Sequence, residues 1–203
     1  MSPKVGMPPL RRAEIVAATI RCLARHGYAG LTMKKVAREA GLSQGILHYY
    51  FADKRAMLVA ALRRVAAQLD RRVAVAQART VRDPRARLHA LIGACLEVAV
   101  DDRDVWTVFI AYWGAMVHDR RLARINGEVY ARARAQIAAL VQDGIRTGEF
   151  RKIPAAAAAL AILGLVDGVS LQLTFEPTLV DRARAARVCE DVLARYLAGE
   201  SPS

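Results

Sequence analysis

Residues 31–54 read LTMKKVAREAGLSQGILHYYFADK, and this stretch decides how the rest of the chain is interpreted. Thr32 is suited to cap a short helix, and Gly41 breaks that helix because glycine adopts positive φ at little cost. Ser43 is suited to cap a second short helix that runs to about Tyr50. Two helices joined by a short turn that contains glycine form a helix-turn-helix unit. An ordinary helical hairpin has the same outline, so the flanking sequence has to distinguish the two.

The rest of the chain carries apolar residues at helical spacing in nearly every long segment. Pro8–Pro9 favours the start of a first helix, and Asp53 is suited to cap a fourth. Because no segment shows a convincing alternating strand pattern, the predicted fold is all-α, with about nine helices. It would comprise an N-terminal three-helix helix-turn-helix head in residues 1–54 and a larger helical domain for ligand sensing and dimerisation in residues 55–203.

Positive charge is concentrated in the first quarter of the chain. The 203 residues carry a formal net charge of +12, and residues 1–54 hold nine Lys or Arg against three Asp or Glu. A dense basic segment favours a polyanionic partner, either nucleic acid or an anionic membrane surface. A generally basic proteome would give the same total without such a partner. The aromatic residues after the second short helix, and Lys54 at the start of the next one, favour nucleic acid.

The stretch that begins at Leu31 resembles the N-terminal domain of TetR-family transcriptional repressors. A looser similarity, at the start of the chain and in residues 105–122, points to the choline-responsive repressors of betaine synthesis within that family. One position departs from the family pattern, because His48 stands where the family usually has tyrosine. The matching positions are Thr32, Val36, Ala37, Ala40, Gly41, Ser43, Gly45, Phe51, Lys54 and Leu58.

The resemblance implies DNA contacts from the two short helices. It assigns phosphate contacts to the capping residues and to polar or basic side chains near them, and a close approach to DNA at Gly45. Gln44 is the candidate base reader, because an amide pairs bidentately with adenine. Lys4, Arg11 and Arg12 are predicted to form a flexible basic arm, with plain solvation as an equal alternative. The candidate DNA-binding residues are Thr32, Lys34, Ser43, Gln44, Gly45, His48, Tyr49 and Lys54.

Residues 153–175 are apolar enough to raise the question of a membrane span. The segment carries one charge, Asp167, at its middle, where insertion costs roughly 2.5–3.5 kcal/mol. We therefore expect no membrane partner and interpret the segment as a helix buried in protein, which pairs with residues 181–197 across a homodimer. Asp167 is either a ligand-binding carboxylate or a structural residue. The candidate dimerisation residues are Gly164, Asp167, Gly168, Leu171, Val188 and Val192.

Aromatic residues gather in the middle of the chain. Trp106, Phe109 and Trp113 share one helical face, and Tyr112 lies beside them in the sequence. Aromatic residues at this spacing are most often core. They also suit a cage that holds a quaternary ammonium by cation–π attraction, worth about 0.5–2 kcal/mol per contact. Glu97 is the candidate countercharge, with a solvated surface residue as the alternative, and these five residues are the candidate ligand site.

These features predict a cytoplasmic repressor that binds a pseudo-palindromic, double-stranded DNA operator as a homodimer. A small-molecule inducer, choline or another cation, would release it from the DNA. A sensor of cationic drugs that controls an efflux pump is the alternative within this class. The alternatives from other classes are a small helical enzyme without a recognisable motif and a non-specific architectural DNA binder. We expect no metal or cofactor, because the three cysteines and four histidines form no ligand motif.

Overall fold

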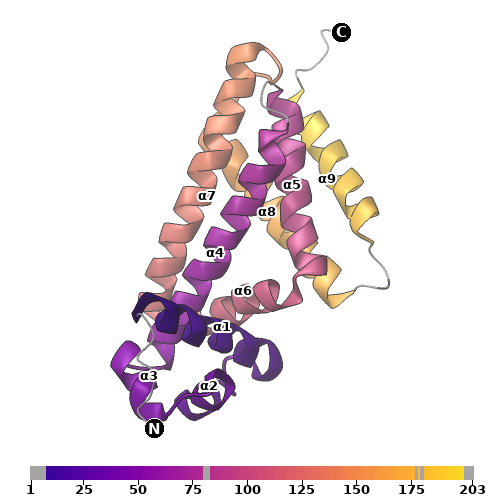
Figure 1. The fold of residues 1–203 in the computed structure, drawn as a ribbon. Helices are drawn as coiled ribbons and strands as arrows, with labels where there is room; N and C mark the ends of the chain where they lie inside the picture. The colour runs from indigo at the N-terminus through magenta and orange to yellow at the C-terminus, as the bar shows by residue number, and fades with distance from the viewer. Residues whose placement is uncertain (1–7, 80–82, 177, 179–180, 199–203) are drawn as a thin grey trace. The chain divides into compact units, whose positions relative to one another are not determined.

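The computed structural model describes residues 8–79, 83–176, 178 and 181–198, and within these ranges it contains nine α-helices and no strand. The all-α prediction is confirmed, and Figure 1 shows the succession of helices. The helices are α1 (Pro8–His26), α2 (Met33–Ala40), α3 (Gln44–Tyr50), α4 (Lys54–Ala78), α5 (Pro84–Asp101), α6 (Arg103–Met116), α7 (Arg120–Thr147), α8 (Ala155–Phe175) and α9 (Arg182–Leu197).

The short helices begin and end where the local sequence predicts. The Thr32 hydroxyl accepts a hydrogen bond from the Lys35 backbone amide, and the Ser43 hydroxyl accepts one from the Ile46 amide. Gly41 has a φ of 66°, a left-handed conformation in which glycine avoids the penalty of a Cβ atom. These three residues therefore fix the turn between α2 and α3, which lie side by side in Figure 1.

By its internal contacts the chain divides into two compact units. The first unit combines residues up to Ala67 with Arg103–Asn126, and α1 packs there against both α2 and α6. A carboxylate ties two of these helices together, because Glu39 of α2 pairs with both Arg21 and Arg25 of α1, each at 2.7 Å. The core of the first unit includes the fully buried side chains Ile15, Leu23, Val36, Leu47, Met57, Leu58, Leu62, Tyr112 and Leu122.

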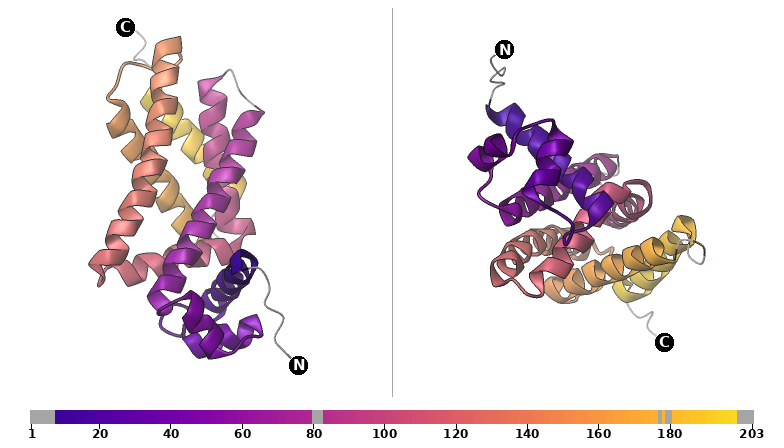
Figure 2. Two further views of the ribbon diagram at one scale, coloured as in Figure 1. Left: turned by 60° about the vertical axis from the view of Figure 1, so that its left-hand side comes forward. Right: turned by 90° about the horizontal axis from the view of Figure 1, so that it is seen from below.

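The second unit combines Gln68–Asp102 with the chain from Gly127 onwards. Within it α5 packs against both α8 and α9, and α8 and α9 lie beside each other in both views of Figure 2. Asp83 caps α5 through the amides of Arg85 and Ala86, and Pro84 occupies the first turn, where its missing N–H costs nothing. The core of this unit includes Leu88, Ile92, Leu96, Val141, Ala159, Ile162, Val166, Cys189 and Leu193.

Helix α8 is long and apolar enough to cross a bilayer by length and composition, and one third of its most apolar window is buried inside the molecule. Its side chains nevertheless have protein partners, since Ala158, Ile162 and Val166 belong to the core of the second unit. Two of its polar side chains are partnered too: Asp167 accepts a hydrogen bond from Tyr130, and the Thr174 hydroxyl donates to the Ser170 carbonyl.

Arg11 and Arg12 do not belong to a flexible arm, because α1 begins at Pro8 and includes both residues. Lys4, the remaining residue of that arm, lies outside the described residues. The two compact units are defined by contacts between residues, not by function. The predicted functional boundary between residues 54 and 55 therefore stays a prediction.

Candidate DNA-binding and effector sites

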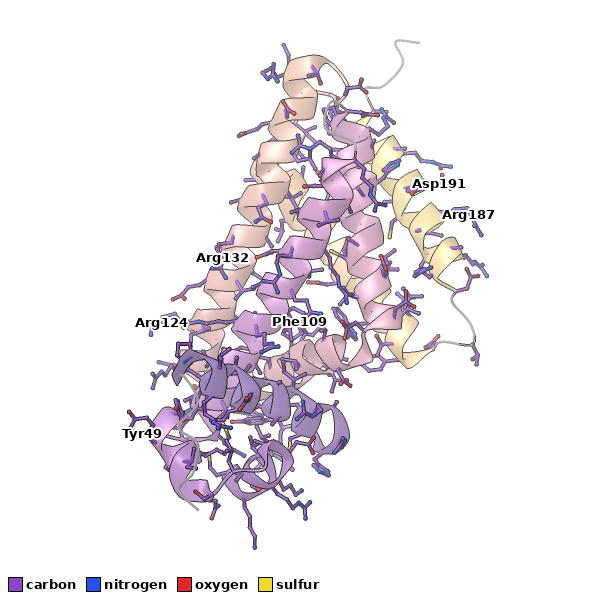
Figure 3. The ribbon with its side chains drawn as sticks, in the orientation of Figure 1. Tyr49, Phe109, Arg124, Arg132, Arg187 and Asp191 are labelled. Carbon is purple, nitrogen blue, oxygen red and sulfur yellow. The ribbon has the colours of Figure 1, made fainter. Side chains whose placement is uncertain are left out.

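The eight candidate DNA-binding residues lie on the helix-turn-helix unit and its two flanks, and we call this set the DNA face. Seven of them are exposed, and Lys54 is half-buried. Tyr49 is the most prominent apolar side chain of the set: it is 82% exposed and points away from α3 in Figure 3. A large aromatic side chain this exposed on a short helix gains nothing from the core, so its position favours contact with a partner.

The DNA face is held in place from behind by buried residues and ring contacts. Leu47 anchors α3 in the core, and the Phe51 amide closes the helix by donating to the Leu47 carbonyl. The Arg12 guanidinium lies 4.8 Å from the centroid of the Phe51 ring, and the Lys54 ammonium lies 4.5 Å from that of Tyr28. These cation–π contacts orient two positive charges at the ends of α1 and α4 without neutralising them.

Gly45 is not required by the fold. A Cβ atom added there would come no nearer than 3.9 Å to another side chain, the Ser43 hydroxyl. The residue also lies inside α3, where glycine is unfavourable by about 0.5–1 kcal/mol relative to alanine. Gly45 therefore leaves the exposed surface of α3 without a side chain at this position.

The single carboxylate of α2 is already neutralised. Glu39 pairs with Arg21 and Arg25, and the hydrogen bond from Arg21, followed by the charge of Arg25, lowers the pKa of Glu39. Lys34, Lys35 and Arg38 of the same helix have no ion-pair partner among the described residues. The charge that α2 presents to solvent is therefore positive, which suits a phosphate backbone.

In α6 the predicted aromatic cluster forms around Trp106. Its ring centroid lies 5.8 Å from Phe109 and 5.6 Å from Trp113, and the two indoles meet edge to face. Trp106 is 6% exposed, and its indole N–H has no hydrogen-bond partner among the described residues. A buried donor without a partner costs free energy, so this N–H has hydrogen-bonding capacity to offer an acceptor.

Tyr112, predicted for the same site, has a structural task. It is fully buried, and its hydroxyl donates a 3.0 Å hydrogen bond to the Leu122 carbonyl of α7. Glu97 lies in the second unit, where it lines a groove of about 760 Å³ between α4 and α5 together with Arg71, Arg72 and Arg79. Its carboxylate is exposed to solvent at this groove.

Sequence reasoning missed the pairing of Asp167 in α8 with Tyr130 in α7. The Tyr130 hydroxyl donates a 2.8 Å hydrogen bond to the Asp167 carboxylate. Burial raises the pKa of Asp167, although the hydrogen bond from Tyr130 acts in the opposite direction. The charge in the middle of an apolar helix was the available signal, but nothing in the sequence identified its partner.

The outer sides of α8 and α9 carry exposed apolar residues. Leu160 of α8 and Val188 and Val192 of α9 are each more than two-fifths exposed. No atom lies within 4 Å of a Cβ built on Gly164 or Gly168, so both glycines face open space. Leu171, also predicted for the dimer surface, is half-buried.

Comparison with known proteins decides the class of this molecule. Residues 15–61 match the model for bacterial regulatory proteins of the tetR family, and residues 84–198 match the BetI-type transcriptional repressor C-terminal domain. The chain belongs to the TetR family of transcriptional regulators, with a BetI-type C-terminal domain. The HTH-type transcriptional regulator BetI of Burkholderia ambifaria is 30% identical over 98% of this chain and 100% of its own. The HTH-type transcriptional regulator BetI of Serratia proteamaculans is 29% identical over 98% of this chain and 99% of its own.

Solved structures place this TetR-family regulator among close structural neighbours. A transcriptional regulator from Saccharomonospora viridis, determined in complex with choline, has a TM-score of 0.83 and 27% identity, covering 93% of this chain and 98% of its own. A transcriptional regulator from Pseudomonas aeruginosa PAO1 has a TM-score of 0.81 and 26% identity, covering 94% of this chain and 93% of its own. The predicted recognition of the family is thus confirmed, and the enzyme alternative is not favoured.

In this TetR-family regulator the two family matches assign general tasks to the two ends of the chain. The tetR-family match includes the whole helix-turn-helix unit, and the BetI-type match includes α8 with its membrane-like composition. The predicted DNA-binding repressor with an N-terminal head and a C-terminal ligand domain is therefore the class to which the chain belongs.

Proposed function

We propose that this TetR-family repressor senses choline or a closely similar quaternary ammonium and releases a pseudo-palindromic operator when it binds. The observation that carries the choice of effector is the Trp106 cluster, in which the Trp106 ring contacts those of Phe109 and Trp113 and its buried indole N–H has no partner among the described residues. The similar regulator from S. viridis, which holds choline in its structure, supports the same chemistry.

Recognition of choline requires two kinds of contact. Its trimethylammonium group cannot lose its charge, so a buried site must replace its hydration with ring faces or a carboxylate. Its hydroxyl oxygen accepts a hydrogen bond, and the Trp106 N–H is a donor that needs an acceptor. The cluster thus offers a π surface for one end of the ligand and a polar handle for the other.

On DNA, the residues of the DNA face divide into positioning and reading groups. Thr32, Ser43, Tyr49 and Lys54 are proposed to contact phosphates, which fix the register of the protein on the duplex. Gln44, exposed at the start of α3, is proposed to read an adenine. His48 replaces the usual phosphate-contacting tyrosine with an imidazole that can donate to the same oxygen.

A homodimer follows from the size of the head, because one helix-turn-helix unit covers one half-site. The exposed apolar residues of α8 and α9, with the open surface at Gly164 and Gly168, support a dimer surface on these helices. A regulator of DNA acts where DNA is, so the proposed location is the cytoplasm. The effector changes the affinity for DNA only if it binds one arrangement of the two heads better than another.

Calorimetric titration of the purified protein with choline, tetramethylammonium and glycine betaine tests the choice of effector. We expect choline to bind, and Trp113→Ala to weaken it by one cation–π contact, about 0.5–2 kcal/mol. Trp106→Phe keeps a ring but removes the N–H, so it should lose the preference for choline over tetramethylammonium, which has no hydroxyl. Tight binding of a bulky cationic dye without any response to choline would instead favour a drug-sensing role.

Fluorescence anisotropy with an operator duplex tests the assignment of the DNA face. Lys54→Ala should weaken binding to all DNA sequences about equally. It should also make the slope of log K against log[salt] less negative by roughly 0.9, the value for one phosphate contact. Gln44→Ala should instead relax the preference at one base position, by about 1–3 kcal/mol. If both variants bind the operator as the wild type does, another surface contacts the DNA.

A further inference from the structure

The structure carries a second feature that suits a cationic effector, and it lies in the second unit. We infer that Asp167, oriented by Tyr130 and flanked by Ser170, is the carboxylate that neutralises the positive charge of an organic monocation. This inference rests on the proposed function for the class of ligand, a quaternary ammonium, and the residues that carry it all belong to the second unit. Glu97, the countercharge expected from the sequence, is replaced in this assignment.

The geometry of Asp167 is that of an oriented but uncompensated carboxylate. Its side chain is half-buried in the middle of α8, and one oxygen accepts the 2.8 Å hydrogen bond from the Tyr130 hydroxyl. No ion pair to Asp167 is present among the described residues. A hydrogen bond from a neutral phenol fixes the direction of the carboxylate while leaving its negative charge in place.

Ser170 supplies an independent indication that something is missing at this position. It lies three residues further along α8, so its side chain neighbours that of Asp167 on the helix surface. Its hydroxyl is 1% exposed and has no hydrogen-bond partner among the described residues. Serine in a helix commonly bonds to the carbonyl four residues back, yet this one leaves its hydrogen-bonding capacity unused.

Burial and the Tyr130 hydrogen bond are the two influences on the pKa of Asp167, and no neighbouring charge among the described residues contributes. The thiol of Cys95 in α5 has its pKa raised to about 12 by burial first and then by the charges of Asp167 and Asp70. Asp70 differs from Asp167, because the charges of Arg132 and Arg71 act on Asp70 and partly offset its burial. Asp167 is therefore a half-buried carboxylate on which no cation acts among the described residues.

This arrangement has a cost that only a ligand would offset. Burial raises the pKa of Asp167, so its ionised form is disfavoured in the folded protein. A carboxylate that served only to accept the Tyr130 hydrogen bond would be replaced by an amide without this cost. A permanent cation restores the balance, because it gives the carboxylate its missing partner in a water-poor environment. Glu97, exposed at its groove, is screened by solvent and gains less from the same pairing.

The test compares choline with its neutral carbon isostere, 3,3-dimethylbutan-1-ol, by calorimetric titration of the full-length protein. Asp167→Asn keeps the shape of the side chain and an acceptor for Tyr130, and removes the charge. We expect this variant to bind choline about 30-fold or more weakly, because truncation of a buried charge pair has effects of this size. The affinity of this variant for the neutral isostere should stay within about threefold of the wild-type affinity, because the isostere carries no charge to pair with Asp167.

Folding is checked by the midpoint temperature of thermal unfolding, Tm, at pH 7. Because Asp167→Asn removes a disfavoured buried charge, its Tm should equal or exceed that of the wild type. Tyr130→Phe, which frees the carboxylate to rotate, should weaken choline binding less than Asp167→Asn does. Glu128→Gln removes an exposed carboxylate from α7 and is the matched control with unchanged binding.

The inference fails if Asp167→Asn binds choline as the wild type does, or if Glu97→Gln loses binding while Asp167→Asn keeps it. An equal loss of choline and of the neutral isostere, with a lowered Tm, would also overturn it, because this pattern shows a purely structural carboxylate. Failure of the proposed function has a different signature, in which the wild-type protein itself does not bind choline.

Discussion

Arg55 Nε lies 2.7 Å from Asp119 Oδ2, so the first turn of α4 is joined to the residue that caps α7. The other oxygen of Asp119 accepts hydrogen bonds from the amides of Arg121 and Leu122, so the carboxylate is fixed in place. Lys54, the last residue of the DNA face, directly precedes Arg55 in the chain. Within the first unit, this ion pair thus connects the start of α4 with the turn that follows α6, the helix that carries the Trp106 cluster.

We predict that this ion pair couples effector binding to DNA release. Asp119→Asn keeps a side-chain cap for α7 but removes the charge that holds Arg55. Operator affinity without choline should stay within about threefold, while the choline concentration needed for half-release should change clearly. Arg55→Gln should show the same change, and the double variant should add little, because contacting residues are not additive.

Titration of choline into the protein–operator complex, followed by anisotropy, measures this coupling. Glu149→Gln, which removes the partner of a solvent-exposed arginine in the second unit, serves as the control. Unchanged half-release in both single variants would show that the Arg55–Asp119 pair has no part in the switch.

Gly45 supplies a prediction that separates folding from DNA binding. Because a Cβ there meets open space, Gly45→Ala should fold normally and gain about 0.5–1 kcal/mol of stability from the better helix former. The added methyl group should nevertheless weaken operator binding, since it holds α3 away from the DNA. Chemical unfolding and operator titration of the same preparation measure the two effects, and unchanged operator affinity would remove Gly45 from the DNA face.

Glu39 links the stability of the first unit to pH. The hydrogen bond from Arg21 and the charge of Arg25 lower its folded pKa below the ordinary value of about 4.3, so its ionised form stabilises the folded state. This contribution is fully present above the unfolded pKa and is lost as the pH falls through the folded pKa. Glu39→Gln should therefore lower the Tm at pH 7, and the difference from wild type should shrink as the pH falls below about 4.

Thermal unfolding of both proteins across this pH range provides the measurement. Glu128→Gln, an exposed carboxylate of α7 without a salt bridge, should show no such pH-dependent difference. A constant difference between Glu39→Gln and wild type from neutral to acid pH would mean that the arginine pairing does not stabilise the fold.

The outer surface of α8 and α9 supplies a prediction about assembly. Gly164→Trp should be accommodated by an isolated protomer, because the glycine faces open space, and it should block a partner at this surface. Val192→Arg should place a charge on the same surface with little effect on the protomer's core. Sedimentation velocity should show monomers for both variants and a dimer for Val75→Arg, an exposed valine of α4. Stable dimers in all three variants would move the interface elsewhere.

The parts of the structure that could be predicted are those determined by near neighbours in the chain. Thr32, Gly41 and Ser43 act within one helical turn, so their capping and turn geometry could be predicted from the sequence. The rings of Trp106 and Trp113 meet because they are seven residues apart on one helix, which is two turns.

The contacts that could not be predicted join distant parts of the chain. Tyr130 and Asp167 are 37 residues apart, on two helices whose relative rotation decides whether they meet. Helical periodicity reveals the apolar side of each helix but not which polar residues at its edge will pair. The supposed arm at Arg11 and Arg12 was wrong for a local reason, since the proline signal for the start of α1 precedes both residues.

The central claim is that one ligand, choline, and one DNA sequence compete for different states of this repressor. The most direct test measures the operator affinity of the full-length protein at fixed salt, with and without saturating choline, on a pseudo-palindromic duplex selected from a random library. We predict that choline weakens the operator affinity and that the operator weakens choline binding by the same factor, because coupling between two sites is reciprocal. An operator affinity that stays unchanged when choline saturates the protein would contradict the account.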